Sequence, residues 1–148
     1  MRIKLSPSLL QAIQVNGEDG YPLEHAGLLI GKRTPTGSEI TELVELENTF
    51  EESSQATRYS LDPLTFFDAE EEAERRGLEV VGIFHSHPDH PARPSAYDLE
   101  WALPYYGYLI TSVVRGKAED TRAWQLTPDR SRFEEIQLDI MQTDPEGE

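Results

Sequence analysis

Two histidines separated by one residue, His85 and His87, follow the apolar run 80–84. Side chains alternate along a strand, so both imidazoles point to the same side of an extended segment. A carboxylate, Asp98, comes after a connection in which prolines restrict the path of the loop. Two imidazoles and one carboxylate match a catalytic zinc site, in which a fourth position is commonly left for water.

A helix start is predicted just before Asp98. Ser95 precedes Asp98 by three residues, and Ser-x-x-Asp at the end of a loop is typical of a helix whose N-cap is the serine. The predicted helix, 95–103, places Asp98 in its first turn, next to the loop. The alternative for the two histidines and Asp98 is a buried polar network without metal, and the joint spacing of these residues favours the metal site.

The spacing resembles a known motif. His-Ser-His-Pro at 85–88, followed after six residues by Ser-Ala-Tyr-Asp at 95–98, resembles the JAMM motif, His-x-His-x(7)-Ser-x-x-Asp, of the MPN/Mov34 family of zinc metallopeptidases. Segment 24–31, a glutamate followed by a short apolar run, resembles the second signature of that family. The likeness covers nearly the whole chain. It implies an α/β (α+β) fold in which a mixed, curved β-sheet is flanked by helices, resembling the cytidine-deaminase-like architecture.

The resemblance also implies a role for each matching residue. In the family the two motif histidines and the aspartate bind Zn²⁺, which carries over to His85, His87 and Asp98. Glu24 matches the general base for the metal-bound water, although most glutamates of an acidic chain are solvated surface groups. Ser95 matches the serine that helps to hold the oxyanion. Many relatives have a cysteine two residues after the glutamate, where this chain has alanine; that cysteine is not a zinc ligand, so little loss is expected.

The implied activity is hydrolysis of a peptide or isopeptide bond by zinc-bound water. The likeness to stand-alone prokaryotic members implies a bond after the C-terminal Gly-Gly of a ubiquitin-like or sulfur-carrier protein. Those members release a residue or short tail after Gly-Gly, or remove a conjugated carrier from lysine. The alternatives are a non-catalytic MPN scaffold, disfavoured because every ligand is kept, and a RadC-like protein, which usually has a preceding helix-hairpin-helix domain. Zinc deaminases use cysteine ligands, and this chain has no cysteine.

The amino-acid composition limits the classes of binding partner and the cellular environment that we expect for the protein. The chain has 28 acidic and 13 basic residues and a net charge of -15, which argues against nucleic-acid binding because phosphates require a basic surface. The same balance is the basis of a second hypothesis, adaptation to a high-salt prokaryotic cytoplasm. No run has the length of a membrane span and no secretory signal is visible, so we expect a cytoplasmic enzyme without a membrane partner. We expect a monomer or a weak homodimer.

One domain, 1–142, is predicted, followed by a disordered acidic tail, 143–148. The first helix should begin after Ser6 and end at Asn16-Gly17, with a resumption of the helix before Glu24 as the alternative. The other expected elements are strands at 26–30, 40–48, 58–61, 80–87, within 105–114, at 122–126 and, as an edge, at 133–138, with helices at 63–76 and 95–103. The side chains expected to face the core from these two helices are Leu64, Phe67, Ala69, Ala73, Leu99, Ala102 and Leu103. Loop 51–57 is expected to border the substrate groove.

Overall fold

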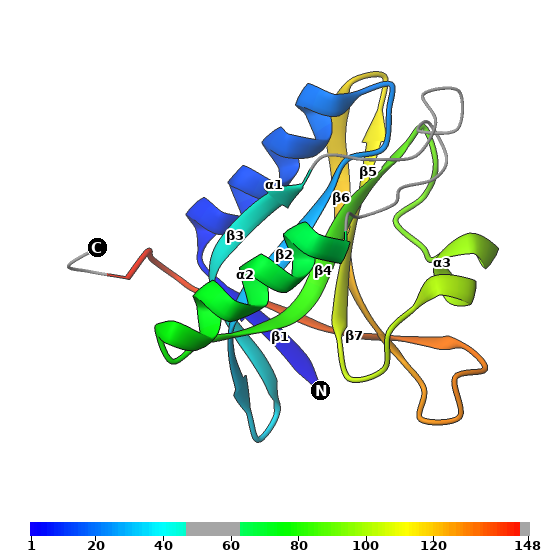
Figure 1. The fold of residues 1–148 in the computed structure, drawn as a ribbon. Helices are drawn as coiled ribbons and strands as arrows, with labels where there is room; N and C mark the ends of the chain where they lie inside the picture. Colours follow the sequence, from blue (N-terminus) through cyan, green and yellow to red (C-terminus); the bar gives the residue numbers. More distant parts are fainter. Residues whose placement is uncertain (47–62, 146–148) are drawn as a thin grey trace.

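The computed structural model describes residues 1–46 and 63–145, and within these residues seven strands form one closed sheet (Figure 1). The strand order is β1-β3-β2-β4-β5-β6-β7. The bounds are Arg2–Leu5 for β1, Ala26–Thr34 for β2, Gly37–Leu46 for β3, Glu79–Pro88 for β4, Gly107–Val114 for β5, Lys117–Leu126 for β6 and Phe133–Ile140 for β7. The predicted strand 58–61, loop 51–57 and end of strand 40–48 lie outside the described residues.

The sheet is mixed and curved, as predicted. β1 pairs in parallel with both β3 and β7, β4 pairs in parallel with β5, and the other neighbours are antiparallel. β1 was not expected, and it closes the sheet. The prediction that 133–138 forms an edge strand is therefore wrong, because β7 has β6 on one side and β1 on the other.

The helices are α1 (Pro7–Gly20), α2 (Pro63–Arg75) and α3 (Ala96–Trp101). α1 begins as predicted: the hydroxyl of Ser6 accepts a hydrogen bond from the backbone N–H of Leu9 at 3.2 Å. The predicted end at Asn16-Gly17 is wrong. A Cβ on Gly17 would lie 3.1 Å from a methyl of Val113 and 3.2 Å from the Cβ of Ser86, so this glycine allows α1 to pack closely against β4 and β5.

The face that α2 turns to the core differs from the prediction. Ala73 is fully buried and Ala69 packs with it, as expected, but Leu64 and Phe67 are 66% and 55% exposed. Phe66 packs instead, and its ring stacks on that of Tyr106 with 6.2 Å between centroids. The spacing explains the difference, because positions 66, 69 and 73 lie on one face of a helix.

α2 ends two residues before Gly77, whose φ of +74° is typical of the glycine that follows a helix. The helix that carries Asp98, α3, is shorter than predicted. Ala102 is buried as expected, but Leu103 is exposed, because the chain leaves the helix after Trp101. At the other end of the chain, Asp144 accepts a hydrogen bond from the backbone N–H of Ser8 at 3.0 Å; residues 146–148 lie outside the described residues.

β4 is central to the packing. It lies between β2 and β5, and all of its residues after Glu79 are buried, which explains the continuous apolar run before the histidines. β4 contributes to two apolar clusters: Val81 and Phe84 to the cluster that includes residues of β1 and α1, Val80 and Ile83 to the cluster that includes Ala73 of α2. The site histidines are thus held on the most buried strand. None of the described helices is both long enough and apolar enough to cross a bilayer.

Candidate metal centre

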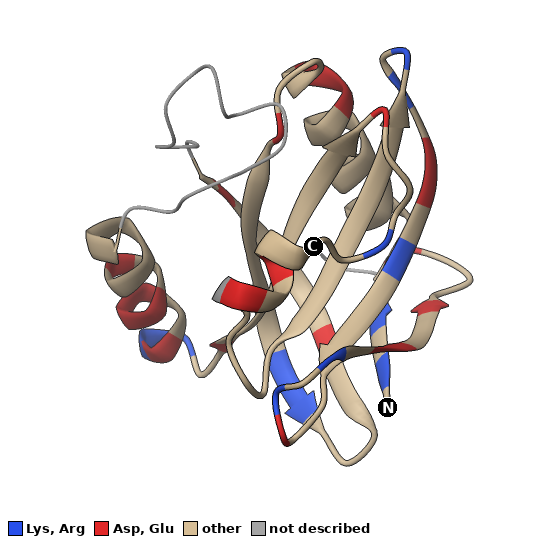
Figure 2. Cartoon of the chain, turned by 90° about the vertical axis from the view of Figure 1, so that its right-hand side faces the viewer, with Lys and Arg blue, Asp and Glu red and all other residues tan. Residues whose placement is uncertain are grey.

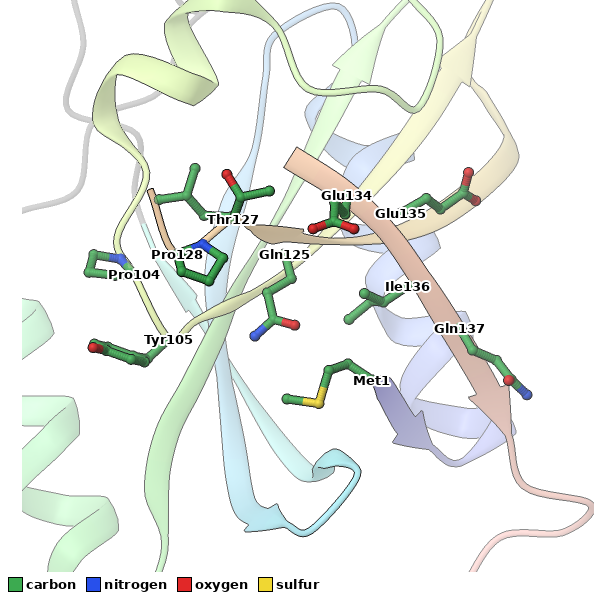
Figure 3. A pocket seen from close by; sticks show the side chains of 11 residues that line it. Met1, Pro104, Tyr105, Gln125, Thr127, Pro128, Glu134, Glu135, Ile136 and Gln137 are labelled. Carbon is green, nitrogen blue, oxygen red and sulfur yellow. The ribbon is translucent and has the colours of Figure 1, made fainter. Parts of the chain in front are cut away.

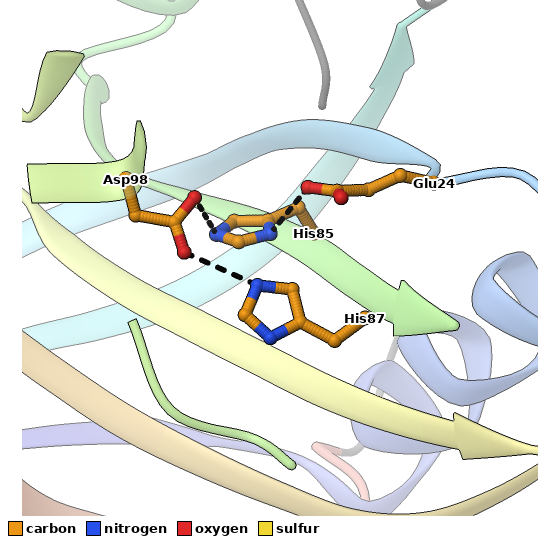
Figure 4. A group of neighbouring side chains, drawn as sticks. All are labelled: Glu24, His85, His87 and Asp98. Carbon is orange, nitrogen blue, oxygen red and sulfur yellow. Dashed lines mark hydrogen bonds and ion pairs between the residues drawn. The ribbon is translucent and has the colours of Figure 1, made fainter. Parts of the chain in front are cut away.

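Four predicted side chains, Glu24, His85, His87 and Asp98, meet at the end of β4 (Figure 4). One donor atom from each lies within 4.8 Å of the donor atoms of the other three. All four side chains are buried, with residue exposures of 2%, 1%, 7% and 4%. We refer to them as the four-residue cluster. Residues from three separate parts of the chain therefore form one compact set of nitrogen and oxygen donors.

β4 sets the positions of the two imidazoles. His85 pairs with Ala26 of β2 and Ile110 of β5, and His87 pairs with Ser112. Their ring centroids lie 5.0 Å apart, as expected for side chains two residues apart on a strand. The strand period of two, read from the sequence, is thus sufficient to predict this pair.

Ser86, between the histidines, holds the segment that carries Glu24. Its side chain points away from the histidines and accepts a hydrogen bond from the backbone N–H of His25 at 2.9 Å. Its own N–H donates to the carbonyl of His25, also at 2.9 Å. This role was not predicted, although the sequence contains a signal for it: a residue between two ligands on a strand must face the opposite side.

Asp98 is positioned by a capping box. The backbone N–H of Asp98 donates to the hydroxyl of Ser95 at 3.1 Å, and the N–H of Ser95 donates to the Asp98 carboxylate at 2.8 Å. The helix start at Ser95 is therefore as predicted. The same carboxylate reaches Nε2 of His87 at 3.1 Å and Nε2 of His85 at 3.6 Å. Both imidazoles thus turn a nitrogen toward Asp98.

The hydrogen-bond partners of His87 favour a cation between its Nε2 and the carboxylate of Asp98. Its Nδ1 lies 2.9 Å from the carbonyl oxygen of Pro91, which can only accept, so Nδ1 carries a proton. A neutral His87 then turns the lone pair of Nε2 toward the Asp98 carboxylate, an arrangement that is favourable only with a proton or a metal ion between them. A carbonyl partner that fixes the tautomer is typical of metal-binding histidines. The donor set therefore fits zinc.

His85 lies between two carboxylates. Its Nδ1 is 3.1 Å from Glu24, and its other nitrogen faces Asp98. Burial alone would lower the pKa of His85, but the charges of Asp98 and Glu24 outweigh it, and the pKa is raised. Burial opposes ionisation of Asp98 as well, yet the two histidines and the N–H of Ser95 lower its pKa to about 2. The cluster is thus electrostatically suited to hold positive charge.

A cavity of about 340 Å³ opens onto the cluster. Its lining residues are Glu24, His87, Pro88, His90, Pro91, Arg93 and Ser95. The fifth predicted site residue, Ser95, is therefore beside the cluster. His25 is not part of the cavity lining: its ring occupies the space that a Cβ on Gly20 would need. A larger hollow of about 620 Å³ lies between β7 and the loop before β5 and is lined by no member of the four-residue cluster (Figure 3).

The loop 88–94, which we call the Pro loop, is held by side chains from neighbouring strands. Three consecutive carbonyls are engaged: that of His90 by the hydroxyl of Ser112 at 2.6 Å, that of Pro91 by His87, and that of Ala92 by the indole N–H of Trp124 at 3.0 Å. These contacts fix the wall of the cavity. Two of them join residues distant in sequence, Ser112 with His90 and Trp124 with Ala92, so no local pattern predicts them.

Asp89 fixes the start of the Pro loop. Its carboxylate accepts hydrogen bonds from the hydroxyl of Tyr21 at 2.6 Å and from the backbone N–H of Arg115 at 2.9 Å. Its own N–H donates to the carbonyl of Val113 at 2.7 Å. The loop thus leaves β4 in a defined direction, tied both to the end of α1 and to the turn between β5 and β6.

Comparison with known proteins identifies the family. A sequence model described as prokaryotic homologs of the JAB domain matches residues 6–127. The chain belongs to this prokaryotic JAB family. The predicted relationship with the JAMM/MPN family is thereby confirmed.

Curated relatives include a probable TtuB-protein conjugate cleaving protease of Thermus thermophilus, 38% identical over 87 residues, which are 57% of this chain and 54% of that protein. A desampylase of Haloferax volcanii is 33% identical over 119 residues, which are 75% of this chain and 81% of that protein. The chain spans only about half the length of the first relative, as it does for a desampylase of Pyrococcus furiosus, at 54%.

Solved structures confirm the fold. A Salinibacter ruber protein is 41% identical, covers 98% of this chain and 93% of its own, and has a TM-score of 0.71. A JAB1/MPN domain protein from Archaeoglobus fulgidus, 20% identical, covers 95% of this chain and 97% of its own with a TM-score of 0.60. The prokaryotic JAB chain thus has the fold that its motif implied.

Proposed function

We propose that this prokaryotic JAB protein is a zinc metallopeptidase that hydrolyses a peptide or isopeptide bond after the C-terminal Gly-Gly of a ubiquitin-like or sulfur-carrier protein. One observation carries the proposal: four buried donors converge within 4.8 Å beside an open cavity. A buried polar network alone would not need such a cavity. The names of the relatives, a conjugate-cleaving protease and a desampylase, support the same reaction class.

His85, His87 and Asp98 would hold the metal, the two imidazoles through the nitrogens that face Asp98. A zinc ion there would supply Lewis acidity and lower the pKa of a bound water to about 7. The protein contributes the geometry. The Pro91 carbonyl fixes the ring of His87, and the capping box fixes the carboxylate of Asp98, so the donors are oriented before the ion arrives.

Glu24 moves the proton in this proposal. Its carboxylate lines the cavity and lies within reach of the same donors, so it accepts the proton of the attacking water and passes it to the leaving amine. Ser95 lines the cavity too. Its hydroxyl oxygen accepts the N–H of Asp98, which leaves the hydroxyl proton available to donate to the oxyanion of the scissile carbonyl.

A Gly-Gly terminus suits this site physically. Glycine has no side chain to conflict with the cavity walls where the substrate backbone approaches the buried cluster. The net charge of -15 makes an acidic carrier a poor electrostatic partner at low salt, so apolar contacts would carry the docking. A non-catalytic scaffold is the alternative function, and the complete donor set argues against it.

The test is cleavage of carrier proteins that bear extensions after Gly-Gly, followed by mass spectrometry. We expect loss of the extension, inhibition by a chelator and recovery with added zinc. A sulfur carrier that ends without Gly-Gly serves as the control substrate and should stay intact. Cleavage that ignores the chelator, or cleavage of unrelated peptides in preference to Gly-Gly carriers, would refute the proposal.

A further inference from the structure

We propose that Arg93 is a specificity residue that binds the free α-carboxylate of a C-terminal residue leaving after Gly-Gly. This inference rests on the proposed function and deepens it. It predicts that the enzyme prefers to release a terminal residue from the carrier over separating a carrier from a lysine side chain.

Arg93 lies at the mouth of the cavity that opens onto the four-residue cluster. Its side chain lines the same cavity as Glu24 and His87, and it is exposed at the mouth. It also lines a second, neighbouring hollow of about 340 Å³. A group bound by Arg93 would therefore sit at the exit from the four-residue cluster.

Within residues 1–46 and 63–145, the guanidinium of Arg93 is unpaired. In the part of the chain that the structure describes, no carboxylate lies at ion-pair distance from Arg93 and none of its guanidinium nitrogens makes a hydrogen bond. Five other described arginines pair with carboxylates: Arg2, Arg33, Arg75, Arg76 and Arg122. Three more, Arg115, Arg130 and Arg132, also lack a carboxylate partner among the described residues, but none of them lines this cavity. In a chain with 28 acidic residues, an arginine without an acidic partner at a cavity mouth is available for an anion from outside.

Charge around the cavity agrees with an anionic ligand. Acidic residues lie on the turns of α2, coloured red in Figure 2, and those from Asp68 to Glu74 are exposed. The cavity lining differs: its one carboxylate, Glu24, is buried beside His85, and the side chains at the mouth include Arg93 and His90. The negative net charge of the protein repels a ligand carboxylate in general, but Arg93 attracts it at the mouth of this cavity.

The backbone presents Arg93 from a rigid frame. The three carbonyls before it are held by side chains of the strands, and Pro94 after it restricts its own backbone. None of these contacts uses the guanidinium, so a substitution at Arg93 should leave the Pro loop in place. Because the backbone of the loop is already ordered, binding at Arg93 has to order only the arginine side chain.

Among the groups that a substrate could present to Arg93, a free α-carboxylate is the best ligand for a guanidinium. A planar guanidinium binds a carboxylate with two parallel hydrogen bonds. Hydrolysis adds one water, breaks the amide bond after the second glycine, and yields a glycine carboxylate and a free amine on the leaving group. When that group is a single amino acid, its α-carboxylate lies about one residue length, roughly 3.5 Å, beyond the scissile bond. When it is a lysine side chain within a protein, no free α-carboxylate is present there.

The test uses a sulfur carrier extended by one residue after Gly-Gly, prepared as the free acid and as the C-terminal amide. Wild-type enzyme should cleave the acid with a kcat/KM on the order of 10- to 100-fold above that of the amide, the range for a hydrogen bond to a charged group. Arg93→Gln should reduce this ratio to about 1 while amide cleavage stays unchanged, and Arg93→Lys should retain part of the preference. Arg75→Gln, which removes the same charge from α2, should keep the wild-type ratio.

The outcomes separate the two proposals. Zinc-dependent cleavage of acid and amide at equal rates, or an equal loss of both in Arg93→Gln, would overturn the role of Arg93 and leave the proposed function standing. Absence of zinc-dependent cleavage of either form would overturn both. An isopeptide-linked conjugate should be cut by wild type and Arg93→Gln at the same rate, and a strong loss in the variant would also contradict the assignment.

Discussion

At the residue scale, Asp98 connects local structure with chemistry. One carboxylate completes the capping box with Ser95 and faces a nitrogen of each histidine. Its pKa of about 2 keeps it ionised at any pH at which the protein would work. The feature that starts a short helix therefore also prepares a cation site.

Glu24→Gln separates metal binding from catalysis. The amide has nearly the same shape but cannot accept the proton, so zinc content and fold should be retained while kcat falls by about 10²- to 10⁴-fold. Glu71→Gln, at an exposed position of α2, is the matched control and should have wild-type activity. Steady-state cleavage at the wild-type rate by Glu24→Gln would show that Glu24 is not the base.

Ser95 should contribute to both stability and rate. Ser95→Ala removes the N-cap of α3, with an expected loss of about 1 kcal/mol of unfolding free energy, and removes a donor worth on the order of 10²- to 10³-fold in kcat. Ser95→Thr keeps the hydroxyl and should restore most of both. Urea melts and cleavage rates for the two variants check this, and an alanine variant that loses stability but no activity would exclude the oxyanion role.

At the element scale, α3 is anchored at both ends. Ser95 caps its start, and after its end the hydroxyl of Tyr108 on β5 accepts the backbone N–H of Leu103 at 2.6 Å. The guanidinium of Arg130 also donates to the carbonyl of Ala102 at 3.3 Å. A helix of 6 residues is too short to be stable alone, so these contacts must hold Asp98 in place.

Ionisation of Tyr108 should make its contribution to the free energy of unfolding depend on pH. Burial raises the pKa of Tyr108 to about 12, so its neutral form stabilises the fold below the unfolded-state pKa of about 10, and this contribution is lost as the pH rises from about 10 to about 12. Tyr108→Phe should cost about 1 kcal/mol at pH 7 through the lost hydrogen bond. In urea melts the advantage of wild type should shrink above pH 10. A difference in unfolding free energy between wild type and Tyr108→Phe that stays constant up to pH 12 would contradict a stabilising role of the neutral Tyr108 side chain.

Local rules explain what the sequence could predict. The period of two brings His85 and His87 together, and the capping rule places Asp98, because both depend on residues a few positions apart. The end of α1 depends instead on contacts of Gly17 with Ser86 and Val113, which no local pattern contains. The same holds for the closure of the sheet by β1, whereas the helical spacing of positions 66, 69 and 73 was a local signal for the buried face of α2.

At the scale of the whole molecule, charge is the dominant property. Acidic residues outnumber basic ones by 28 to 13, and the arginine–carboxylate ion pairs of the described residues lie mostly at exposed positions, where each contributes little. Self-repulsion at low salt is therefore expected to oppose folding.

Salt should stabilise the protein. Raising KCl from 0.1 M to 1 M shortens the screening length from about 10 Å to about 3 Å, so the free energy of unfolding from urea melts should rise. A double variant, Glu70→Gln with Glu71→Gln, removes two exposed charges from α2 and should respond less to KCl. An unfolding free energy that does not increase with KCl would remove the basis of the salt hypothesis.

The most direct test of the metal centre is a calorimetric titration of zinc into metal-free protein, with elemental analysis of the product. Wild type should bind one zinc per chain, and the His85→Ala, His87→Ala double variant should bind none while Glu24→Gln still binds one. Wild-type stoichiometry in the double variant would contradict the central claim, because the zinc would then be held elsewhere.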